Sequence, residues 1–560
     1  MKKTMDRRQF LKYSGAGLAG LGLSTLNVPF FRIGKASAAI SSNAWCFGVM
    51  SDTQWKPDNE ATGGENTCAT GIIDVLNQQF IEHNCKFVIQ VGDLVDKDRY
   101  TDSSDGSHNL ATHAAHREVL YDAGIGFYPL RGNHESSQEA ANEFVSLWPQ
   151  TQGGGDNVNG ATNFVQSDIE ALKGLSYSFD YENVRCVMID QFVRKDGSNY
   201  DGTSSYNNNM VDQVAWVDAM VSSRPDDYHA FVLAHKNLIG GNHKDNLFGE
   251  NLTANADSRN EFIKSLNTNN AGCYISGHDH MHHRSLVSDD DGYYNVQQLI
   301  TSSNSYKFYT PKSGDDGRET MLQEELWTIG YYIFTVDGPR VTIDFYSSST
   351  GEDYGDSDED KLYSYKEEPF FLRERFGYSL NGTRFEVAQS ESYTSIVDSY
   401  NGTTAKILSG TNSNHETDLV GNALTKTVNT GWADGSLVDD AASNIFTLWG
   451  LVDNLSLHDR ELTGMWPNED ESQVTDTYTL SISYNPRKMS KLGTGSFCIA
   501  ARNENDEWVN AVELNDGGTK TFKKGPWQSS YGLGTYGVDP TTKTVWAVLN
   551  HEGDFVAKLV

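Results

Sequence analysis

The alternation of apolar and polar positions divides the chain into two parts with different expected structures. From Trp45 to about Gly277, short runs rich in β-branched and aromatic residues alternate with segments whose apolar residues recur at helical spacing. A buried strand is predicted at residues 46–50, a helix around residues 72–81, and the next strand at residues 86–91. This alternation is typical of a layered α/β domain.

The same alternation of helix and strand continues further along this part. The spacing predicts a helix over residues 211–222 ahead of a strand at 230–234, and a helix around 261–266 ahead of a strand at 273–276. A hairpin is predicted over residues 331–346, because an Asp-Gly pair lies between two runs of strand-forming residues. We expect this hairpin to close the sheet.

Beyond residue 370 the pattern predicts strands only. Residues 478–484 alternate between apolar and polar side chains, and residues 508–512 and 545–549 are further apolar runs between turn-rich segments. We therefore expect a C-terminal all-β domain, resembling a β-sandwich, over residues 370–560.

An acidic stretch rich in Ser and Gly separates the two parts. It covers residues 347–368, and its simplest interpretation is an exposed linker, placed at 351–369 between an α/β domain at 39–350 and the β-rich domain. A calcium-binding loop is the alternative, although the carboxylates lack the regular spacing and the terminal Glu of a helix–loop–helix calcium site.

Composition excludes two other classes of protein. The chain has 560 residues, a formal net charge of −32, and 38% hydrophobic and 11% aromatic residues, so it can bury enough apolar surface to fold as more than one domain. Binding to nucleic acid through its phosphates is not expected, because that mode needs a basic surface. The acidic charge also favours small substrates over long polyanions.

The first 38 residues have the features of an export signal. Arg7 and Arg8 precede an apolar, glycine-rich run over about residues 14–26, and small side chains at residues 36–38 suit a signal peptidase. The segment at 1–38 resembles a twin-arginine signal peptide, which implies export by the twin-arginine machinery. We expect a periplasmic or secreted mature protein with no permanent membrane span, because the run is too short to cross a bilayer. An uncleaved N-terminal anchor is the alternative.

The six cysteines show no CxxC pair, and five of them lie in or beside strand-like apolar runs. Buried thiols are therefore expected, in preference to a disulfide framework or a zinc site built from thiolates. A disulfide between Cys68 and Cys85 remains open.

Five polar segments directly follow predicted strands. Open α/β sheets bind their ligands at the edge where the carboxyl ends of the strands meet. We therefore expect the five segments to lie close together. They are Ser51-Asp52-Thr53-Gln54, Gly92-Asp93-Leu94-Val95-Asp96, Gly132-Asn133-His134-Glu135, His235, and Gly277-His278-Asp279-His280.

The carboxylate, imidazole and amide groups of these segments form a mixed nitrogen and oxygen ligand set. Such a set suits Zn²⁺, Fe or Mn²⁺, and the lack of thiolates argues against a structural zinc. Two such ions about 3.5–4 Å apart can hold both an attacking hydroxide and the oxygens of a phosphate. The expected reaction is hydrolytic displacement at phosphorus.

The order of these motifs resembles the calcineurin-like metallophosphoesterase family over roughly residues 44–350. The resemblance implies a four-layer α/β/β/α sandwich and a centre of two divalent or trivalent transition-metal ions, which are Fe, Mn or Zn. It implies that Asp93 bridges the two ions. By their places in the motifs, the other implied ligands are Asp52 and His280 for the first ion, and Asn133, His235 and His278 for the second.

The resemblance also implies catalytic roles for two residues. His134 would lie beside the substrate, where it binds a phosphoryl oxygen or protonates the leaving group, and Asp96 would fix its orientation. A structural role for His134 is the alternative. Asp279, between the two ligand histidines, is expected to point away from the metals.

Two positions depart from the family's pattern. Gln54 stands where the family usually has a histidine. Its amide oxygen can still bind a metal, but more weakly than imidazole, so we expect the first ion to bind more loosely or to be Mn²⁺ or Fe²⁺. Purple acid phosphatases have a tyrosine shortly after the bridging Asp, where this chain has Leu94-Val95-Asp96. A coloured tyrosinate–iron centre is therefore not expected.

Three further residues beside the motifs have two interpretations each. His282 and His283 either touch the substrate or lie exposed on a loop, and exposure is favoured. Arg131 either binds a phosphate oxygen as a fork or forms a salt bridge with a neighbouring carboxylate.

Two functional hypotheses follow. The leading one is an exported, metal-dependent phosphoesterase that hydrolyses small phosphate mono- or diesters with a hydroxide held by two metal ions. The alternative is an envelope or extracellular module that binds a glycan or a protein, and whose metal domain has weak or lost activity through the change at Gln54.

Overall fold

The computed structural model describes residues 43–55, 65–96, 109–193, 208–311, 318–326, 328–348, 370–387, 403–409, 425–450, 477–488, 495–503 and 505–560. The predicted export signal at 1–38 lies outside these residues. The predicted linker at 351–369, with its calcium-loop alternative, also lies outside them.

Two β-sheets form the centre of the first domain. The first sheet has the strand order β14-β13-β12-β1-β2-β3, in which β1, β2 and β3 run parallel and β12 pairs with β1 in the antiparallel direction. Its strands are β1 (Trp45–Met50), β2 (Phe87–Val91), β3 (Gly126–Leu130), β12 (Gly330–Asp337), β13 (Arg340–Ser348) and β14 (Phe370–Ser379).

The second sheet has the strand order β11-β9-β10-β8-β7-β6-β5-β4. At its centre β6, β7, β8 and β10 run parallel. Its strands are β4 (Thr162–Gln166), β5 (Tyr177–Tyr181), β6 (Val184–Ile189), β7 (His229–Ala234), β8 (Cys273–Ser276), β9 (His282–Ser288), β10 (Asn295–Ile300) and β11 (Glu319–Glu325).

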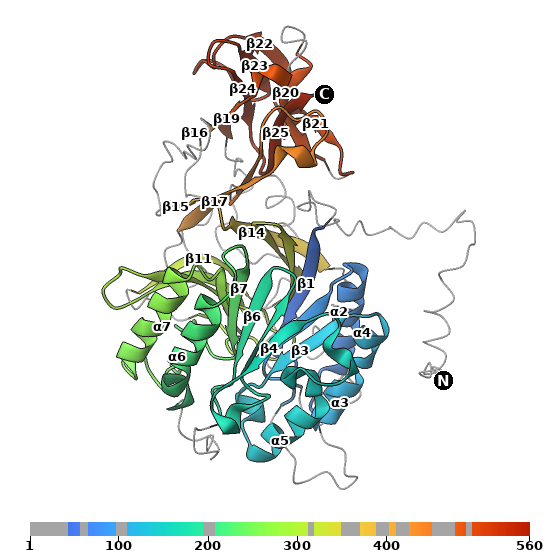
Figure 1. Ribbon diagram of the computed structural model, residues 1–560, viewed down its shortest axis with the longest axis vertical. Coiled ribbons are helices and arrows are strands. Elements are labelled where there is room, and N and C mark those ends of the chain that lie inside the picture. The colour runs from blue at the N-terminus through green and yellow to red at the C-terminus, as the bar shows by residue number, and fades with distance from the viewer. Residues whose placement is uncertain are drawn as a thin grey trace, which may run out of the picture. The chain divides into compact units, whose positions relative to one another are not determined.

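Helices cover the outer face of each sheet (Figure 1). Among the described residues, four helices pack on the first sheet and two on the second. On the first sheet these are α2 (Thr70–Glu82), α3 (Asn109–Ala115), α4 (Glu118–Asp122) and α5 (Gln138–Leu147); on the second they are α6 (Asn208–Ser222) and α7 (Ala256–Thr268).

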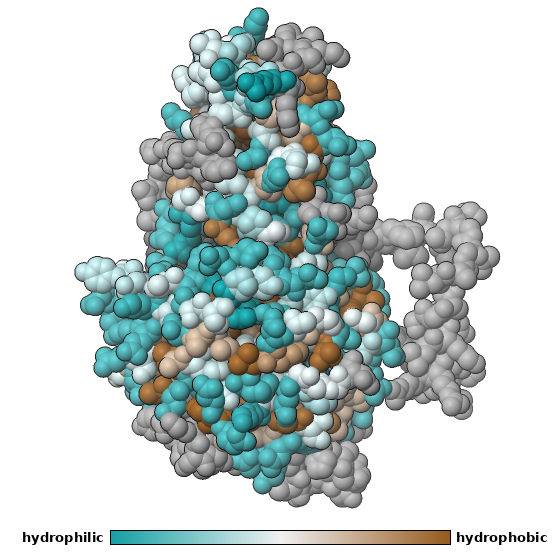
Figure 2. All heavy atoms as spheres, viewed as in Figure 1, coloured by the Kyte–Doolittle hydropathy of each residue, from teal (hydrophilic) through white to brown (hydrophobic). Residues whose placement is uncertain are grey.

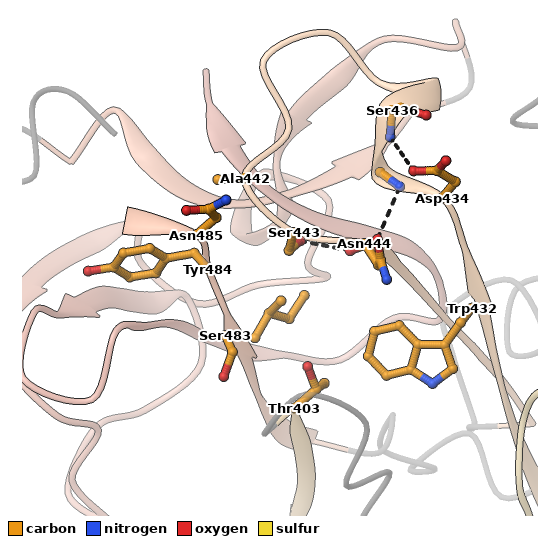
Figure 3. Close-up of a pocket in the computed structure, with 12 residues that line it drawn as sticks. Thr403, Trp432, Asp434, Ser436, Ala442, Ser443, Asn444, Ser483, Tyr484 and Asn485 are labelled. Carbon is orange, nitrogen blue, oxygen red and sulfur yellow. Dashed lines mark hydrogen bonds between the residues drawn. The ribbon is translucent and has the colours of Figure 1, made fainter. Parts of the chain in front are cut away.

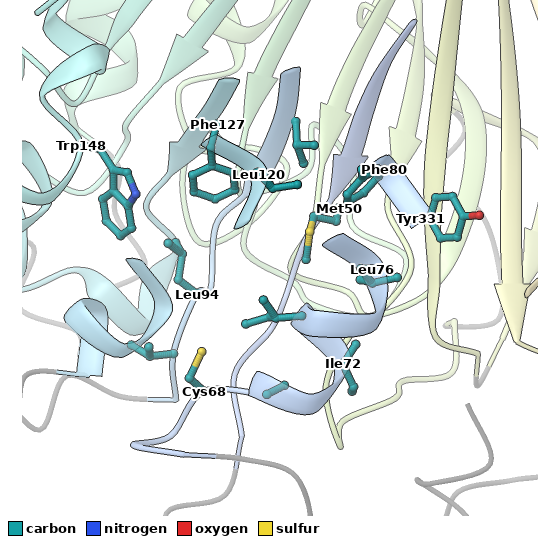
Figure 4. Packing of buried hydrophobic residues seen from close by; sticks show 14 of the residues in the cluster. Met50, Cys68, Ile72, Leu76, Phe80, Leu94, Leu120, Phe127, Trp148 and Tyr331 are labelled. Carbon is teal, nitrogen blue, oxygen red and sulfur yellow. The ribbon is translucent and has the colours of Figure 1, made fainter. Parts of the chain in front are cut away.

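Three hydrophobic clusters hold these layers together. Figure 4 shows the cluster under α2, where Ile72, Leu76 and Phe80 pack toward Met50 of β1. A second cluster fills the space between the two sheets, and a third lies under α6 and α7. Helix, sheet, sheet and helix therefore form four layers, and the expected α/β/β/α sandwich is confirmed.

The predicted hairpin is present, but the first sheet extends past it. β12 and β13 pair along their whole length around a turn at Gly338, and β14 then pairs with β13. Residues 370–379 therefore belong to the first sheet, whereas the sequence pattern assigns them to the C-terminal domain. Strand periodicity alone does not reveal which partner a strand chooses, so the predicted boundary at 370 falls one strand too early.

The C-terminal part is built from strands in two sheets. Their orders are β15-β17-β18-β25-β20-β21 and β16-β19-β24-β23-β22, and one hydrophobic cluster lies between them. The predicted all-β architecture is confirmed. The bounds are β15 (Arg384–Val387), β16 (Thr404–Ser409), β17 (Lys426–Ala433), β18 (Ile445–Trp449), β19 (Thr477–Ser483), β20 (Phe497–Arg502), β21 (Trp508–Asn510), β22 (Thr521–Lys524), β23 (Thr535–Asp539), β24 (Thr544–Leu549) and β25 (Gly553–Leu559).

One predicted strand in this part is shorter than expected. β21 ends at Asn510, and a 3₁₀ helix follows at Ala511–Glu513. The side-chain oxygen of Asn510 accepts a hydrogen bond from the backbone N–H of Val512 at 3.3 Å, which caps the helix and ends the strand. The strand predicted at 508–512 therefore extends two residues too far at its C-terminal end.

All six cysteines are buried and free, as the pattern of thiols predicts. Cys46 Sγ donates a hydrogen bond to Cys85 Sγ at 3.9 Å, and no disulfide joins Cys68 to Cys85. Hydrophilic residues cover most of the described surface on the face shown in Figure 2, with small hydrophobic areas between them. Among the described residues, none of the helices has the length and apolar composition needed to cross a membrane.

Candidate metal centre

The five polar segments meet at one edge of the two sheets. Asp52 and Asp93 follow the parallel strands β1 and β2, and His235 and His278 follow the parallel strands β7 and β8. Four side chains in this region sit on backbone with positive φ: Asp52 (52°), Asp93 (48°), His278 (72°) and His280 (54°). This conformation is uncommon for residues other than glycine, and it concentrates at functional sites where the surrounding structure enforces it.

These side chains form two groups that share one carboxylate. Asp93, His235 and His278 place ligand atoms within 4.8 Å of one another, and so do Asp52, Asp93 and His280. All five residues are buried. Asp93 therefore lies where a single carboxylate can contact two metal ions.

Backbone carbonyls fix the orientation of two of the histidines. His235 Nδ1 lies 2.9 Å from the carbonyl oxygen of Val91, and His280 Nδ1 lies 2.9 Å from that of Lys307. In each ring Nδ1–H donates to the carbonyl, so Nε2 is the nitrogen that faces the site and is left to bind either a proton or a metal ion. This is the arrangement that a metal-binding histidine needs.

Electron-rich atoms face one another in the interior of the site. His235 Nε2 lies 3.1 Å from Asn133 Oδ1 and 3.3 Å from Asp93 Oδ1, and His280 Nε2 lies 3.3 Å from Asp52 Oδ1. Lone pairs at these distances repel one another unless a proton or a metal ion lies between them.

The pKa values reflect this concentration of charge. Burial lowers the pKa of His235, but the charge of Asp93 outweighs burial and raises that pKa to about 9. Burial raises the pKa of Asp52 to about 7, partly offset by His235. Burial would also raise the pKa of Asp93, yet the charges of His235 and His134 hold it well below its usual range. A cation held between Asp93 and His235 Nε2 would take the place of the proton on that nitrogen.

A buried polar atom at the site supports the fit of metal ions. Gln54 Oε1 and His278 Nε2 have no hydrogen-bond partner among the residues that the structure describes. Gln54 Nε2 lies 3.2 Å from Asp93 Oδ2 and 3.1 Å from His280 Nε2. This amide therefore reaches the ligand group formed by Asp52, Asp93 and His280. Rotation of the amide by half a turn would present its oxygen to a metal there. The donor set, the unpaired oxygen of Gln54 and the absence of thiolates from this site together suit a pair of transition-metal ions.

Two glycines let neighbouring strands approach the carboxylates closely. A Cβ on Gly132 would lie 1.9 Å from Asp93 Oδ1, and a Cβ on Gly277 would lie 2.4 Å from Asp52 Oδ2. Any larger residue at either position would have to displace a candidate ligand.

His134 and Asp96 form a pair beside the shared carboxylate. His134 Nδ1 lies 3.0 Å from Asp96 Oδ1, and Nε2 lies 3.7 Å from Asp93 Oδ2. Burial would lower the pKa of His134, but Asp93 and Asp96 outweigh it and raise that pKa. Asp96 also accepts hydrogen bonds from Lys307 Nζ at 3.0 Å and from the Tyr306 hydroxyl at 3.2 Å. The His134 side chain is 13% exposed, so it can be reached from solvent.

The loop that carries His134 is held by two buried charged residues. Glu135 accepts hydrogen bonds from the backbone N–H groups of Val95 at 2.9 Å and Gly132 at 2.8 Å, which ties this loop to the one after β2. Arg131 Nε donates to Asp190 Oδ2 at 2.6 Å, and both side chains are fully buried. Of the two interpretations of Arg131, the salt bridge is therefore the one that the structure contains.

Sequence reasoning missed a polar cluster on the other side of His278. Asp279 is buried and points away from the two ligand groups, as expected, but it binds His243, with 2.5 Å between Asp279 Oδ1 and His243 Nδ1. The His243 ring packs on that of His278 with 4.2 Å between centroids. Asp245 Oδ2 lies 3.6 Å from His278 Nε2 and 2.5 Å from Lys236 Nζ. The only signal in the sequence is the short distance of these residues from His235 along the chain.

The favoured interpretation of His282 and His283 is wrong. Both begin β9 and are buried, at 1% and 0% exposure. His282 Nε2 lies 3.0 Å from Glu374 Oε2, and His283 lies between Glu319 at 2.9 Å and Glu324 at 3.1 Å. These two histidines therefore form buried hydrogen bonds with carboxylates of neighbouring strands, and neither lies on an exposed loop.

A family model described as calcineurin-like phosphoesterase matches residues 47–282. These residues form a calcineurin-like phosphoesterase domain. The resemblance noted from the motifs is confirmed for this segment, and the phosphoesterase domain contains every candidate ligand from Asp52 to His280. The match to this family indicates a hydrolase acting on phosphate esters, and the family implies a centre of two metals.

Several solved structures are similar to this chain at low identity. A dimetal phosphatase from Danio rerio is 14% identical, with 53% of this chain and 95% of that chain covered and a TM-score of 0.33. GAP50, the anchor in the inner membrane complex of Plasmodium, is 13% identical, with 55% and 86% covered and a TM-score of 0.32. The purple acid phosphatase PPD1 from yellow lupin seeds is 12% identical, with 55% and 52% covered and a TM-score of 0.35.

Because all three TM-scores lie below 0.5, the assignment of the phosphoesterase domain depends on the family match and on the geometry of the site. No curated protein matches the chain.

Proposed function

We propose that this protein is an exported phosphoesterase that hydrolyses small phosphate monoesters or diesters with two transition-metal ions. Two bound ions would supply a hydroxide nucleophile near neutral pH and neutralise charge on the phosphoryl oxygens. The observation that carries the proposal is that Asp93 belongs to both groups of potential ligands. A shared carboxylate is what a two-metal site requires.

The candidate ligands would be shared between the two ions. Asp93 would bridge the ions. Asp52, His280 and the amide oxygen of Gln54 would hold one ion, while Asn133, His235 and His278 would hold the other. The carbonyl groups that accept from the two Nδ1 atoms keep the imidazoles in the tautomer that binds metal.

His134 would act on the substrate itself. Its Nδ1 is held by Asp96, so Nε2 remains to donate a proton to the leaving oxygen or a hydrogen bond to a phosphoryl oxygen. The raised pKa of His134 favours the protonated ring that such a donor needs. Asp96, itself fixed by Lys307 and Tyr306, would orient the ring without touching the substrate.

The test combines metal analysis with hydrolysis of p-nitrophenyl phosphate and bis-p-nitrophenyl phosphate in Mn²⁺, Fe²⁺ or Zn²⁺. Asp93→Asn should lose metal and activity together, because it removes the shared charge. Asp122→Asn, at the exposed end of α4, is the matched control and should keep both. If the parent protein retains transition metal but neither ester is hydrolysed with any of the ions, the binding-module alternative gains support.

Export is the second element of the proposal. It is supported by the Arg7-Arg8 pair, the apolar run that follows and the small residues near position 38. Replacing both arginines by lysine should leave the protein in the cytoplasm, as measured by cell fractionation with an antibody. Unchanged export of this variant would contradict the twin-arginine route.

A further inference from the structure

A pocket in the C-terminal β-sandwich lies well away in the sequence from every candidate ligand. It has a volume of about 370 Å³, within the range of ~300–1,000 Å³ that is typical of small-molecule sites. Trp432 is the next-to-last residue of β17 in one sheet, and Ser483 is the last residue of β19 in the other. The pocket therefore lies where the two sheets of the sandwich meet at one end (Figure 3).

The base of this pocket is apolar and its rim is polar. Trp432, Ile482 and Ala442 are nearly fully buried, at 4%, 1% and 3% exposure. The Trp432 ring packs on Phe446 with 5.0 Å between ring centroids, which holds the indole in place. Asp434 and Asn485 are exposed at the rim.

Hydrogen bonds from backbone N–H groups fix the walls of the pocket before a ligand binds. The N–H of Asn485 donates to the carbonyl of Ala442 at 2.7 Å, and the N–H of Ser436 donates to Asp434 Oδ1 at 2.8 Å. The N–H of Gly435 donates to Asn444 Oδ1 at 3.4 Å. A wall that is fixed before binding lowers the entropic cost of holding a ligand.

Three other polar side-chain atoms of the pocket do not take part in hydrogen bonds that fix its walls. Asn444 Nδ2, Ser483 Oγ and Asn485 Nδ2 form no hydrogen bond with the residues that the structure describes. Figure 3 shows Ser443, Asn444, Ser483, Thr403 and Trp432 arranged around the hollow. The pocket thus offers both donors and acceptors around an apolar floor.

The charge of the lining decides which ligand fits. Among the described residues that line the pocket, Asp434 is the one charged residue, and none is Lys or Arg. A phosphate ester or an acidic polymer would be repelled. A purely apolar ligand would leave the amides and hydroxyls without partners, which costs free energy. A neutral sugar ring satisfies both conditions, because its C–H face packs on an aromatic ring and its hydroxyl groups both donate and accept.

We propose that this pocket binds a neutral oligosaccharide. Trp432 and Ile482 provide the apolar floor, and Asn444, Ser483 and Asp434 bind the hydroxyl groups. Such a site would hold the enzyme on a polysaccharide while the phosphoesterase domain acts, and it does not depend on whether the metal centre functions as proposed.

The test uses the full-length protein and isothermal titration with neutral hexasaccharides of glucose, mannose, xylose and N-acetylglucosamine, with oligogalacturonate as the acidic comparison. At least one neutral probe should bind at up to millimolar concentration. Asn444→Ala should weaken that binding by roughly 3- to 10-fold, the usual effect of losing one hydrogen bond. Asn505→Ala is the matched control, because Asn505 lies exposed in the turn before β21, at the far edge of the sheet that contains β17.

Three outcomes would overturn the proposal: no neutral probe binds, oligogalacturonate binds as well as the neutral sugars, or Asn444→Ala binds as tightly as the parent. Trp432→Phe offers a second readout. A change of tryptophan fluorescence on binding should be lost in this variant while the aromatic floor and the fold are kept. Asp93→Asn should leave sugar binding unchanged, which separates failure of this proposal from failure of the proposed phosphoesterase activity.

Discussion

Gly132→Ala tests how closely Asp93 is held. The backbone at Gly132 has φ −100° and ψ −172°, which any residue can adopt, so the substitution adds no backbone strain. The new Cβ, however, would lie 1.9 Å from Asp93 Oδ1 and 2.3 Å from the backbone nitrogen of Asp93, where ordinary contact begins at 3.4 Å. The carboxylate and its loop must therefore move outward by more than an ångström.

That movement should separate the shared carboxylate from both ligand groups. It would also break the hydrogen bond from the His134 backbone N–H to Asp93 Oδ1, which measures 3.1 Å. We expect loss of at least one metal ion per chain and a fall in turnover of at least ~10²-fold, the effect of a displacement of about 1 Å at a reacting group. Overpacking should also cost about 1–3 kcal/mol of unfolding free energy.

The assay is metal content by mass spectrometry on protein purified in parallel, together with hydrolysis of p-nitrophenyl phosphate and thermal unfolding. Gly154→Ala is the matched control: it lies in the same domain, has no positive φ, and its nearest atom is 3.5 Å away. It should keep metal and activity. A folded Gly132→Ala protein with the full metal content and the parental rate would refute the placement of Asp93.

Three further predictions follow from the site and its surroundings. His134→Ala should keep both metals and lose ~10²–10⁴-fold in turnover if the residue donates a proton, and Asp96→Asn should add little to that loss in the double variant; a single variant as fast as the parent would reject the role. Gln54→His should tighten binding of the first ion, measured by competition with a chelator, and an unchanged affinity would mean that this side chain is not a ligand. Burial lowers the pKa of His283, but the carboxylates of Glu319 and Glu324 outweigh burial and raise that pKa to about 10. The ion pairs of His283 should therefore stabilise the fold fully below the unfolded pKa of ~6.5 and lose this effect as pH rises toward 10. The unfolding temperature of the parent should fall more steeply over that range than that of His283→Gln, and parallel curves would contradict this.

The sequence predicts those parts of the fold that local periodicity encodes. The strands predicted at 46–50, 86–91, 230–234 and 273–276 correspond to β1, β2, β7 and β8, because each is a short apolar run followed by a polar segment. Parallel strands place their carboxyl ends at one edge, so the meeting of the polar segments could also be expected.

Contacts between distant strands could not be predicted in the same way. His282 and His283 look like an exposed extension of a motif, and only the pairing of β9 with β11 and the position of β14 bring Glu319 and Glu374 against them. The same holds for β14 itself, whose partner β13 lies across the acidic stretch.

The cluster around His243 shows a second limit. Asp279 follows a candidate ligand directly, and the sequence indicates only that its side chain alternates away from the metals. That it meets His243 depends on the path of the loop after β7, which no local pattern describes.

The most direct test of the account is X-ray diffraction on crystals of the purified protein, with anomalous data collected at the absorption edges of Mn, Fe and Zn. The account predicts two peaks about 3.5–4 Å apart on either side of the Asp93 carboxylate, one beside Asp52 and His280 and the other beside His235 and His278. A single peak, peaks that do not share Asp93, or a site that takes up none of these ions when they are added would contradict it.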